Sequence, residues 1–336
     1  MTADIALSVE NLSVSFPMRG RDPAGKKRAL LAVDNVSFSI QRGRTLGIVG
    51  ESGSGKTTAA MALARLVPKL GGQISIDGID FGALDAAELR RARQRVQIIF
   101  QDPYSALNPR LRAGEIVREP LIYAGTTSRA EQDEIIDELF EAVGLRPEQK
   151  TLFPHQFSGG QRQRIGIARA LSTRPSLIIC DEPVSALDVA VQSQILNLLK
   201  SLQKKFSLTY LFISHDLGVI QHMCDDIAVM YMGQFMEYAD RDSFFAAPRH
   251  PYSRALLVAV PTIKVGAAPG NIHLVEGAIP DLTQEQTGCR FASRCPHSEA
   301  KCGDGVPQLM AAGLHKSVPL GGLHRFACHR MDDLPS

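Results

Sequence analysis

A glycine-rich octapeptide offers the clearest chemistry in this sequence. Residues 50–57, GESGSGKT, fit the pattern G-x-x-x-x-G-K-[ST]. Glycines let such a loop curl around phosphate oxygens with its N–H groups pointing inward, and a following helix adds its positive end. The pattern assigns Lys56 to the β- and γ-phosphates of a nucleotide and the Thr57 hydroxyl to Mg²⁺. The candidate nucleotide-binding residues are Gly50, Ser52, Gly53, Ser54, Gly55, Lys56, Thr57 and Thr58.

Two carboxylates follow an apolar run at residues 176–182, SLIICDE. A buried parallel strand places its last residues at the carboxyl edge of the sheet, where phosphates also bind. Asp181 is therefore a candidate for holding Mg²⁺ through water, and Glu182 for polarising a water that attacks the γ-phosphate. The alternative for the glycine-rich segment is a flexible turn, and the alternative for Asp181 and Glu182 is a pair of solvated loop carboxylates. The strand before the loop and the helix after it favour the nucleotide.

The elements that position these residues alternate between strand and helix patterns. We predict strands at 7–16, 32–40, 45–49, 176–180 and 208–214, and a helix at 56–67 that stops at Pro68. Ser128 and Glu131 form a capping box for a helix ended by Gly144, and Ile195, Leu199 and Leu202 share the stripe of another helix. The fold class is thus α/β, a P-loop NTPase with a mainly parallel sheet, an antiparallel β edge and a helical insert.

Composition excludes several classes of protein. The 336 residues include 37 Lys plus Arg and 35 Asp plus Glu, which gives a net charge of +2. This charge is too small to indicate binding to nucleic acid or to lipid head groups. The amino terminus lacks the pattern of a secretory signal, and no apolar run approaches the roughly 18 residues of a membrane-spanning helix. We therefore expect a soluble chain whose membrane role depends on partners.

Four further segments, together with the acidic pair, carry a family resemblance. Residues 156–164, QFSGGQRQR, look like the signature sequence of ABC ATPases, and residues 185–188, SALD, resemble the D-loop of that family. Ser214-His215-Asp216 resembles its switch histidine, Gln101 its Q-loop glutamine, and Asp181-Glu182 its acidic pair. These motifs occur in the order typical of the family across about two thirds of the chain.

The resemblance implies an ATP-binding and ATP-hydrolysing subunit that pairs head to tail with a second ATPase. Each ATP would lie between the phosphate loop of one subunit and the signature of the other. His215 would contact the γ-phosphate and orient Glu182, and Gln101 would approach Mg²⁺. Phe16 would stack on adenine, with a core position as the alternative. The residues implied for the facing nucleotide are Ser158, Gly159, Gly160, Gln161 and Asp188.

A subfamily resemblance rests on the segments at 101–109, QDPYSALNP, and 250–253, HPYS. Both look like ATPase subunits of dipeptide and oligopeptide importers. The resemblance implies an ABC ATPase domain at 1–249, with its helical subdomain at about 102–164, and a carboxyl-terminal extension at 250–336. It also implies a second, related ATPase, two transmembrane permease subunits and an extracytoplasmic peptide-binding protein as partners, with no nucleic acid. The location implied is the cytoplasmic face of the inner membrane.

Four of the six cysteines gather in the last 50 residues of the chain. Cys289, Cys295, Cys302 and Cys328 are separated by five, six and twenty-five residues, and this spacing alone names no metal. In the subfamily the four positions look like those that hold a 4Fe-4S cluster. Zinc, with His297, His324 or His329 as substitute ligands, unpaired thiols and disulfides are the alternatives. Cys180 and Cys224 are predicted to be small core residues.

Three alternatives compete with peptide import. A related importer would carry nickel, opines or sugars. An ABC ATPase acting on DNA or ribosomes would carry long coiled-coil or zinc-bearing insertions or a second cassette, whereas this chain has one cassette and a short insert. A metal-sensing regulator would not need the complete hydrolytic set of residues.

Overall fold

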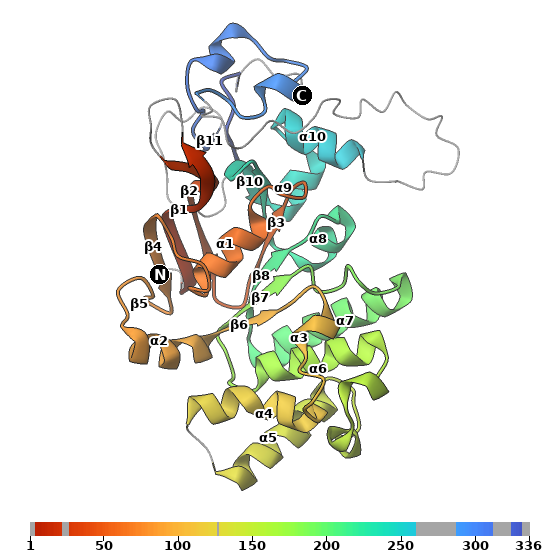
Figure 1. Cartoon of the computed structure of the whole chain (residues 1–336). Coiled ribbons are helices and arrows are strands. Elements are labelled where there is room, and N and C mark those ends of the chain that lie inside the picture. Colours follow the sequence, from red (N-terminus) through yellow and green to blue (C-terminus); the bar gives the residue numbers. More distant parts are fainter. Residues whose placement is uncertain (1–3, 22–26, 126–127, 260–286, 312–323, 331–336) are drawn as a thin grey trace, which may run out of the picture. The chain divides into compact units, whose positions relative to one another are not determined.

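The computed structural model describes residues 4–21, 27–125, 128–259, 287–311 and 324–330 (Figure 1). Its contacts divide the chain into two compact units built from discontinuous segments. The first unit contains Met1–Ser8, Ser39–Thr45 and Gln73–Ile213, and the second contains Val9–Phe38, Leu46–Gly72 and Ser214–Ser336. Four of the dividing points fall inside the first four strands, which are β1 (Ile5–Arg21), β2 (Lys27–Gln41), β3 (Thr45–Val49) and β4 (Gly71–Ile76), and the fifth follows Ile213.

Three parallel strands form the core of the first unit. β7 (Leu177–Asp181) lies between β6 (Val96–Ile99) and β8 (Thr209–Ile213). Every residue of β7 and β8 is buried, as expected for parallel strands covered on both faces. The short strand β5 (Ile79–Asp80) pairs with β4 in antiparallel fashion. The predicted strands at 176–180 and 208–214 are thus confirmed within one residue at each end.

Helices of the first unit group around α6 (Gly159–Leu171), which packs against both α4 (Ala113–Ala124) and α5 (Arg129–Ala142). The predicted capping box of α5 is present, because Ser128 Oγ accepts from the Glu131 N–H at 3.3 Å and the Glu131 carboxylate accepts from the Ser128 N–H at 2.7 Å. The helical insert is therefore confirmed. The other helices of the unit are α2 (Ala86–Ala92), α3 (Pro103–Ala106) and α7 (Val189–Phe206), with 3₁₀ turns at Arg93–Arg95, Pro147–Thr151 and Pro154–Gln156.

The second unit joins the phosphate-loop segment to the carboxyl-terminal third of the chain. β3 runs parallel to β9 (Asp226–Tyr231), which pairs with β10 (Gln234–Asp240) in antiparallel fashion. β12 (Arg325–Phe326) then pairs with β10, and β11 (Met310–Ala311) with β12. The helices are α1 (Lys56–Leu63), α8 (Leu217–Met223), α9 (Arg241–Ala246) and α10 (Pro251–Val258), with 3₁₀ turns at Ala292–Arg294 and Ala300–Gly303.

Three predicted elements differ in length from those in the structure. α1 ends at Leu63 rather than Val67, because Arg65 adopts a left-handed φ of 53° that cannot continue a right-handed helix. β1 and β2 extend beyond the predicted residues 7–16 and 32–40. No helix in the part of the chain that the structure describes is long and apolar enough to span a membrane.

Candidate functional site

The phosphate loop connects β3 to α1 within the second unit, and its backbone requires glycine at two points of close approach. Gly50 and Gly55 have φ values of 155° and 102°. A Cβ atom on Gly50 would lie 2.0 Å from the Met230 carbonyl oxygen, and one on Gly55 would lie 2.3 Å from the Ala32 carbonyl oxygen. Both contacts are with backbone atoms, which cannot swing aside. Glycine is therefore needed here for space as well as for conformation.

Lys56 places its ammonium group inside this loop. The Nζ atom donates to the Gly50 carbonyl at 2.7 Å, to the Glu51 carbonyl at 2.8 Å and to Ser54 Oγ at 3.3 Å. Lys56 is 6% exposed and is also the first residue of α1. A cation at a helix N-terminus is unfavourable unless an anion balances it. The loop therefore combines a buried positive charge with helix N–H groups, an arrangement suited to phosphate.

One of the two carboxylates at the end of β7 contacts the predicted glutamine in the first unit. Asp181 is buried, and the next residue, Glu182, adopts a left-handed φ of 47° while its N–H donates to the Ile213 carbonyl at 3.0 Å. Gln101, which follows β6, donates from Nε2 to Glu182 Oε2 at 2.9 Å. The parallel order of β6, β7 and β8 thus brings the predicted Gln101 and Glu182 side chains into contact.

The signature segment and the D-loop segment also meet within the first unit. Ser158 caps α6, since its Oγ accepts from the Gln161 N–H at 3.3 Å and Gln161 Oε1 accepts from the Ser158 N–H at 3.0 Å. A Cβ on Gly160 would lie 2.5 Å from Val191 Cγ1, so this helix end packs closely on α7. Asp188 caps α7 by accepting from the Val191 N–H at 2.9 Å. Two capped helix N-termini therefore lie next to each other.

His215 and Phe16 belong to the second unit, as the phosphate loop does. The Ser214 N–H donates to the Ile48 carbonyl of β3 at 3.3 Å, which places the next residue, His215, near the carboxyl end of the strand leading into the loop. The His215 side chain is exposed. Phe16 is 36% exposed on β1, so it is not a core residue, and the adenine-stacking role stays a prediction.

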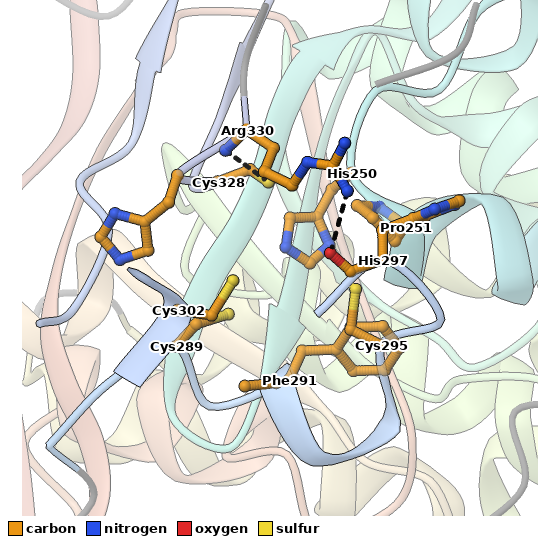
Figure 2. A pocket seen from close by; sticks show the side chains of 11 residues that line it. His250, Pro251, Cys289, Phe291, Cys295, His297, Cys302, Cys328 and Arg330 are labelled. Atoms are coloured by element: carbon orange, nitrogen blue, oxygen red, sulfur yellow. Dashed lines mark hydrogen bonds between the residues drawn. The ribbon is translucent and has the colours of Figure 1, made fainter. Parts of the chain in front are cut away.

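The four carboxyl-terminal cysteines line one pocket in the second unit. Figure 2 shows Cys289, Cys295, Cys302 and Cys328 around it, together with Phe291 and His250. The Cys289 N–H donates to the Cys302 carbonyl at 2.8 Å, which brings the segments that carry these two cysteines together. All six cysteines belong to the described residues, and none of them forms a disulfide. Cys180 and Cys224 are buried, as predicted.

Burial disfavours the charged thiolates in this pocket. It raises the pKa of Cys289 to about 11 and also raises the pKa values of Cys295 and Cys328. Four thiols sharing one pocket fit a thiophilic metal group in donor type, because bound metal supplies the positive charge that thiolates need. Among the residues that the structure describes, however, no group of three or more Cys, His, Asp or Glu side chains is arranged to hold a metal ion.

The three histidines considered as substitute ligands have different surroundings. His297 and His329 line the cysteine pocket, and His329 Nε2 lies 2.8 Å from the Gly305 carbonyl oxygen. His324 Nε2 instead lies 2.6 Å from Glu237 Oε1. His250 also lines the pocket; burial lowers its pKa to about 4, and its Nδ1 accepts from the Tyr252 N–H at 3.1 Å. His250 is therefore a neutral cap of α10.

Sequence reasoning missed the residues of the carboxyl-terminal region that contact the phosphate loop. Arg294 forms an ion pair with Glu51, and the Tyr252 hydroxyl accepts from the Glu51 N–H. Arg294 lies 243 positions from Glu51, so no local periodicity could indicate the contact. The HPYS segment marked Tyr252 only by resemblance.

Comparisons with known proteins agree with this geometry. Residues 33–185 match the family model described as ABC transporter, and residues 236–302 match the one described as oligopeptide/dipeptide transporter, C-terminal region. A putative peptide import ATP-binding protein of Brucella ovis is 46% identical over 92% of this chain and 95% of the relative. The oligopeptide transport ATP-binding protein AppF of Bacillus subtilis is 43% identical over 96% of each.

Solved structures share the fold. The ATP-binding cassette MJ0796, solved as a dimer in a post-hydrolysis state bound to ADP and Pi, is 31% identical with a TM-score of 0.62, over 70% of this chain and 98% of that one. The chain belongs to the ABC transporter ATP-binding family, in the branch that carries the oligopeptide/dipeptide transporter C-terminal region. The predicted fold class and family are thereby confirmed.

Proposed function

We propose that this chain hydrolyses ATP to drive import of dipeptides or oligopeptides, as a peripheral subunit on the cytoplasmic face of the inner membrane. The observation that carries the ATP part is the phosphate loop, in which the buried Lys56 ammonium lies at the start of α1. The C-terminal region matched at 236–302 and the names of the relatives support peptides as the cargo.

The chemistry assigned to the chain's own residues is positioning and proton handling. Lys56 and the loop N–H groups bind the β- and γ-phosphates, while Thr57 and Asp181 would hold Mg²⁺, which supplies charge neutralisation. Glu182 polarises the attacking water. The hydrogen bond from Gln101 to Glu182 supports this role, because it orients the carboxylate. His215 contacts the γ-phosphate.

A second ATPase subunit completes each site in this proposal. Ser158, Gly159, Gly160 and Gln161 present a capped helix N-terminus that suits the γ-phosphate bound on a facing subunit, with Asp188 beside it. The dimeric state of the cassette MJ0796 supports such pairing. The other proposed partners are two transmembrane permease subunits and an extracytoplasmic peptide-binding protein; the facing ATPase is a related, non-identical chain.

We assign residues 1–249 to the ATPase domain, with its helical subdomain at about 102–164, and residues 250–336 to the extension. Cys289, Cys295, Cys302 and Cys328 would hold a 4Fe-4S cluster as a structural staple, which supplies metal–thiolate bonds to a loop-rich segment. Their shared pocket supports this assignment. Zinc is the alternative that metal analysis distinguishes.

Transport assays in cells test the cargo. We expect Lys56→Ala to abolish uptake of labelled di- and oligopeptides, while an Arg241→Ala control, in an exposed ion pair of the same unit, transports normally. Uptake of nickel, opines or sugars is measured in the same strains. Loss of one of these with peptide uptake intact would replace peptide import by that cargo.

A further inference from the structure

A residue of the carboxyl-terminal region binds the side chain of Glu51, the second residue of the phosphate loop. Arg294 Nη1 donates to Glu51 Oε2 at 2.9 Å, and Nη2 donates to Glu51 Oε1 at 3.0 Å. The Arg294 side chain is 6% exposed and that of Glu51 26%. Two parallel bonds to one carboxylate fix orientation as well as distance. The Glu51 side chain is therefore held in one position.

The main chain of Glu51 is held as well. Its N–H donates to the Tyr252 hydroxyl at 2.9 Å. Arg294 Nη1 also donates to the Tyr231 hydroxyl at 3.2 Å, and Phe291 packs on both tyrosine rings, with centroid distances of 5.4 Å to Tyr231 and 5.3 Å to Tyr252. The cluster of Phe291, Tyr231 and Tyr252 thus positions both the Tyr252 hydroxyl and the Arg294 guanidinium, which bind Glu51.

These contacts reach the lysine that binds phosphate. The Glu51 carbonyl accepts from Lys56 Nζ at 2.8 Å and from the Ser54 N–H at 3.2 Å. A glycine-rich loop loses much conformational freedom when it closes on a ligand, so contacts that order it beforehand strengthen binding. Glu51 therefore connects Arg294 and Tyr252, which lie outside the loop, to the Lys56 ammonium inside it.

A second arginine, Arg290, contacts the residues that lie next to Ser54 of the loop. Arg290 donates to the Met232 carbonyl and to Asp34. The neighbouring Gly233 N–H donates to the Ser54 carbonyl at 2.8 Å. Arg290 and Arg294 both lie between Cys289 and Cys295, in a turn closed by the Ala292 N–H donating to the Cys289 carbonyl at 3.0 Å.

We propose that Arg294 is a positioning residue for ATP, which acts through Glu51 to hold the phosphate loop ready for the β- and γ-phosphates. Arg290 supports the same loop through the Met232–Gly233 turn, so the cysteine-bearing turn is a structural part of the ATP site. This proposal rests on the proposed function, because it presumes that ATP is the ligand of the loop.

Titration calorimetry with ATP and Mg²⁺ on the full chain tests the proposal. We expect Arg294→Ala to raise the dissociation constant for ATP by roughly ten-fold, and Glu51→Gln, which keeps one hydrogen bond to Arg294, to raise it by less. The double variant should do little more than Arg294→Ala, because that substitution already removes the coupled pair. Turnover at saturating ATP stays within about two-fold, since no reacting group changes. Arg294→Lys, which keeps one contact, lies between wild type and Arg294→Ala.

Controls separate the outcomes. Arg241→Ala should bind ATP as wild type does. Tyr252→Phe, which removes one oxygen, should also weaken binding, and it keeps the test open should Arg294→Ala fail to fold. Wild-type affinity in folded Arg294→Ala or in Glu51→Gln, or additive effects in the double variant, would overturn the positioning role. Failure of the wild type itself to bind ATP would instead overturn the proposed function.

Discussion

The phosphate loop and the cysteine pocket belong to the same unit but are organised in different ways. The loop is one contiguous segment whose shape follows from left-handed glycines and from the bonds of Lys56. The pocket collects four thiols from residues 289 to 328, and the described side chains do not converge as metal ligands. A site made of consecutive backbone groups is formed by the chain alone, whereas a site made of scattered side chains needs its ligand to converge.

The largest expected effect is on ATP turnover, and it separates the hydrolysis step from the binding of ATP by the phosphate loop. Glu182→Gln keeps the size and the hydrogen bonding of the side chain but removes the polarising carboxylate, so we expect ATP turnover to fall about 10²–10⁴-fold with ATP affinity unchanged. Glu141→Gln, an exposed carboxylate of the same unit, is the matched control. Near-normal turnover in Glu182→Gln, measured by phosphate release, would remove Glu182 from its role.

The next effect concerns the cysteine pocket alone. Anaerobically purified protein should be brown with about four iron atoms per chain, and Cys302→Ser should lose the iron and unfold at a lower temperature. Cys224→Ser, which alters a buried cysteine outside the pocket, should keep the iron. Metal analysis and absorption spectra show whether iron is bound and which cysteines it needs. Stoichiometric zinc without iron in the wild type would contradict the cluster.

A smaller effect, on the free energy of unfolding, measures how closely the backbone of the phosphate loop packs against its neighbours. Gly55→Ala combines a left-handed φ with a Cβ at 2.3 Å from a backbone oxygen, whereas Gly53 has a φ of 79° and nothing within 4 Å of its Cβ. We expect Gly55→Ala to lower the free energy of unfolding by about 2–5 kcal/mol and Gly53→Ala by about 1–2 kcal/mol. Equal losses in denaturant titrations would mean that the close approach of Gly55 contributes nothing.

The smallest effect tests how far the ordered site extends beyond the phosphates. Phe16→Ala should weaken ATP binding by roughly 2–10-fold if its ring stacks on adenine, and leave binding of inorganic triphosphate unchanged. Met18→Ala, an exposed apolar residue of the same strand, is the control. Calorimetry gives both affinities. Equal weakening of ATP and triphosphate would argue against stacking.

Local sequence patterns predicted those parts of the fold that depend on neighbouring residues. The strand at Thr45–Val49 and the Ser128–Glu131 capping box are present as predicted, because strand burial and capping are determined within a few residues. The end of α1 was placed four residues too late, because nothing in the apolar pattern marks the left-handed Arg65. The grouping of four cysteines followed from their positions in the sequence, but the 4Fe-4S cluster came from resemblance, since the spacing alone named no ligand.

Long-range contacts were beyond prediction. The bond between Gln101 and Glu182 depends on β6 and β7 being neighbours, which periodicity could not show. The Arg294–Glu51 pair depends on how a 3₁₀ turn after Cys289 lies against a loop 243 positions earlier. Such pairs are set by tertiary packing rather than by the local chain.

Crosslinking in the assembled complex tests most directly whether two subunits enclose each ATP. A photoreactive amino acid replaces the exposed Gln156, just before the signature serine Ser158, in the Glu182→Gln background, and adducts are identified by mass spectrometry after purification from solubilised membranes. Our account predicts ATP-dependent adducts on the phosphate loop of a second ATPase chain. Adducts confined to single molecules, whatever nucleotide is present, would contradict it.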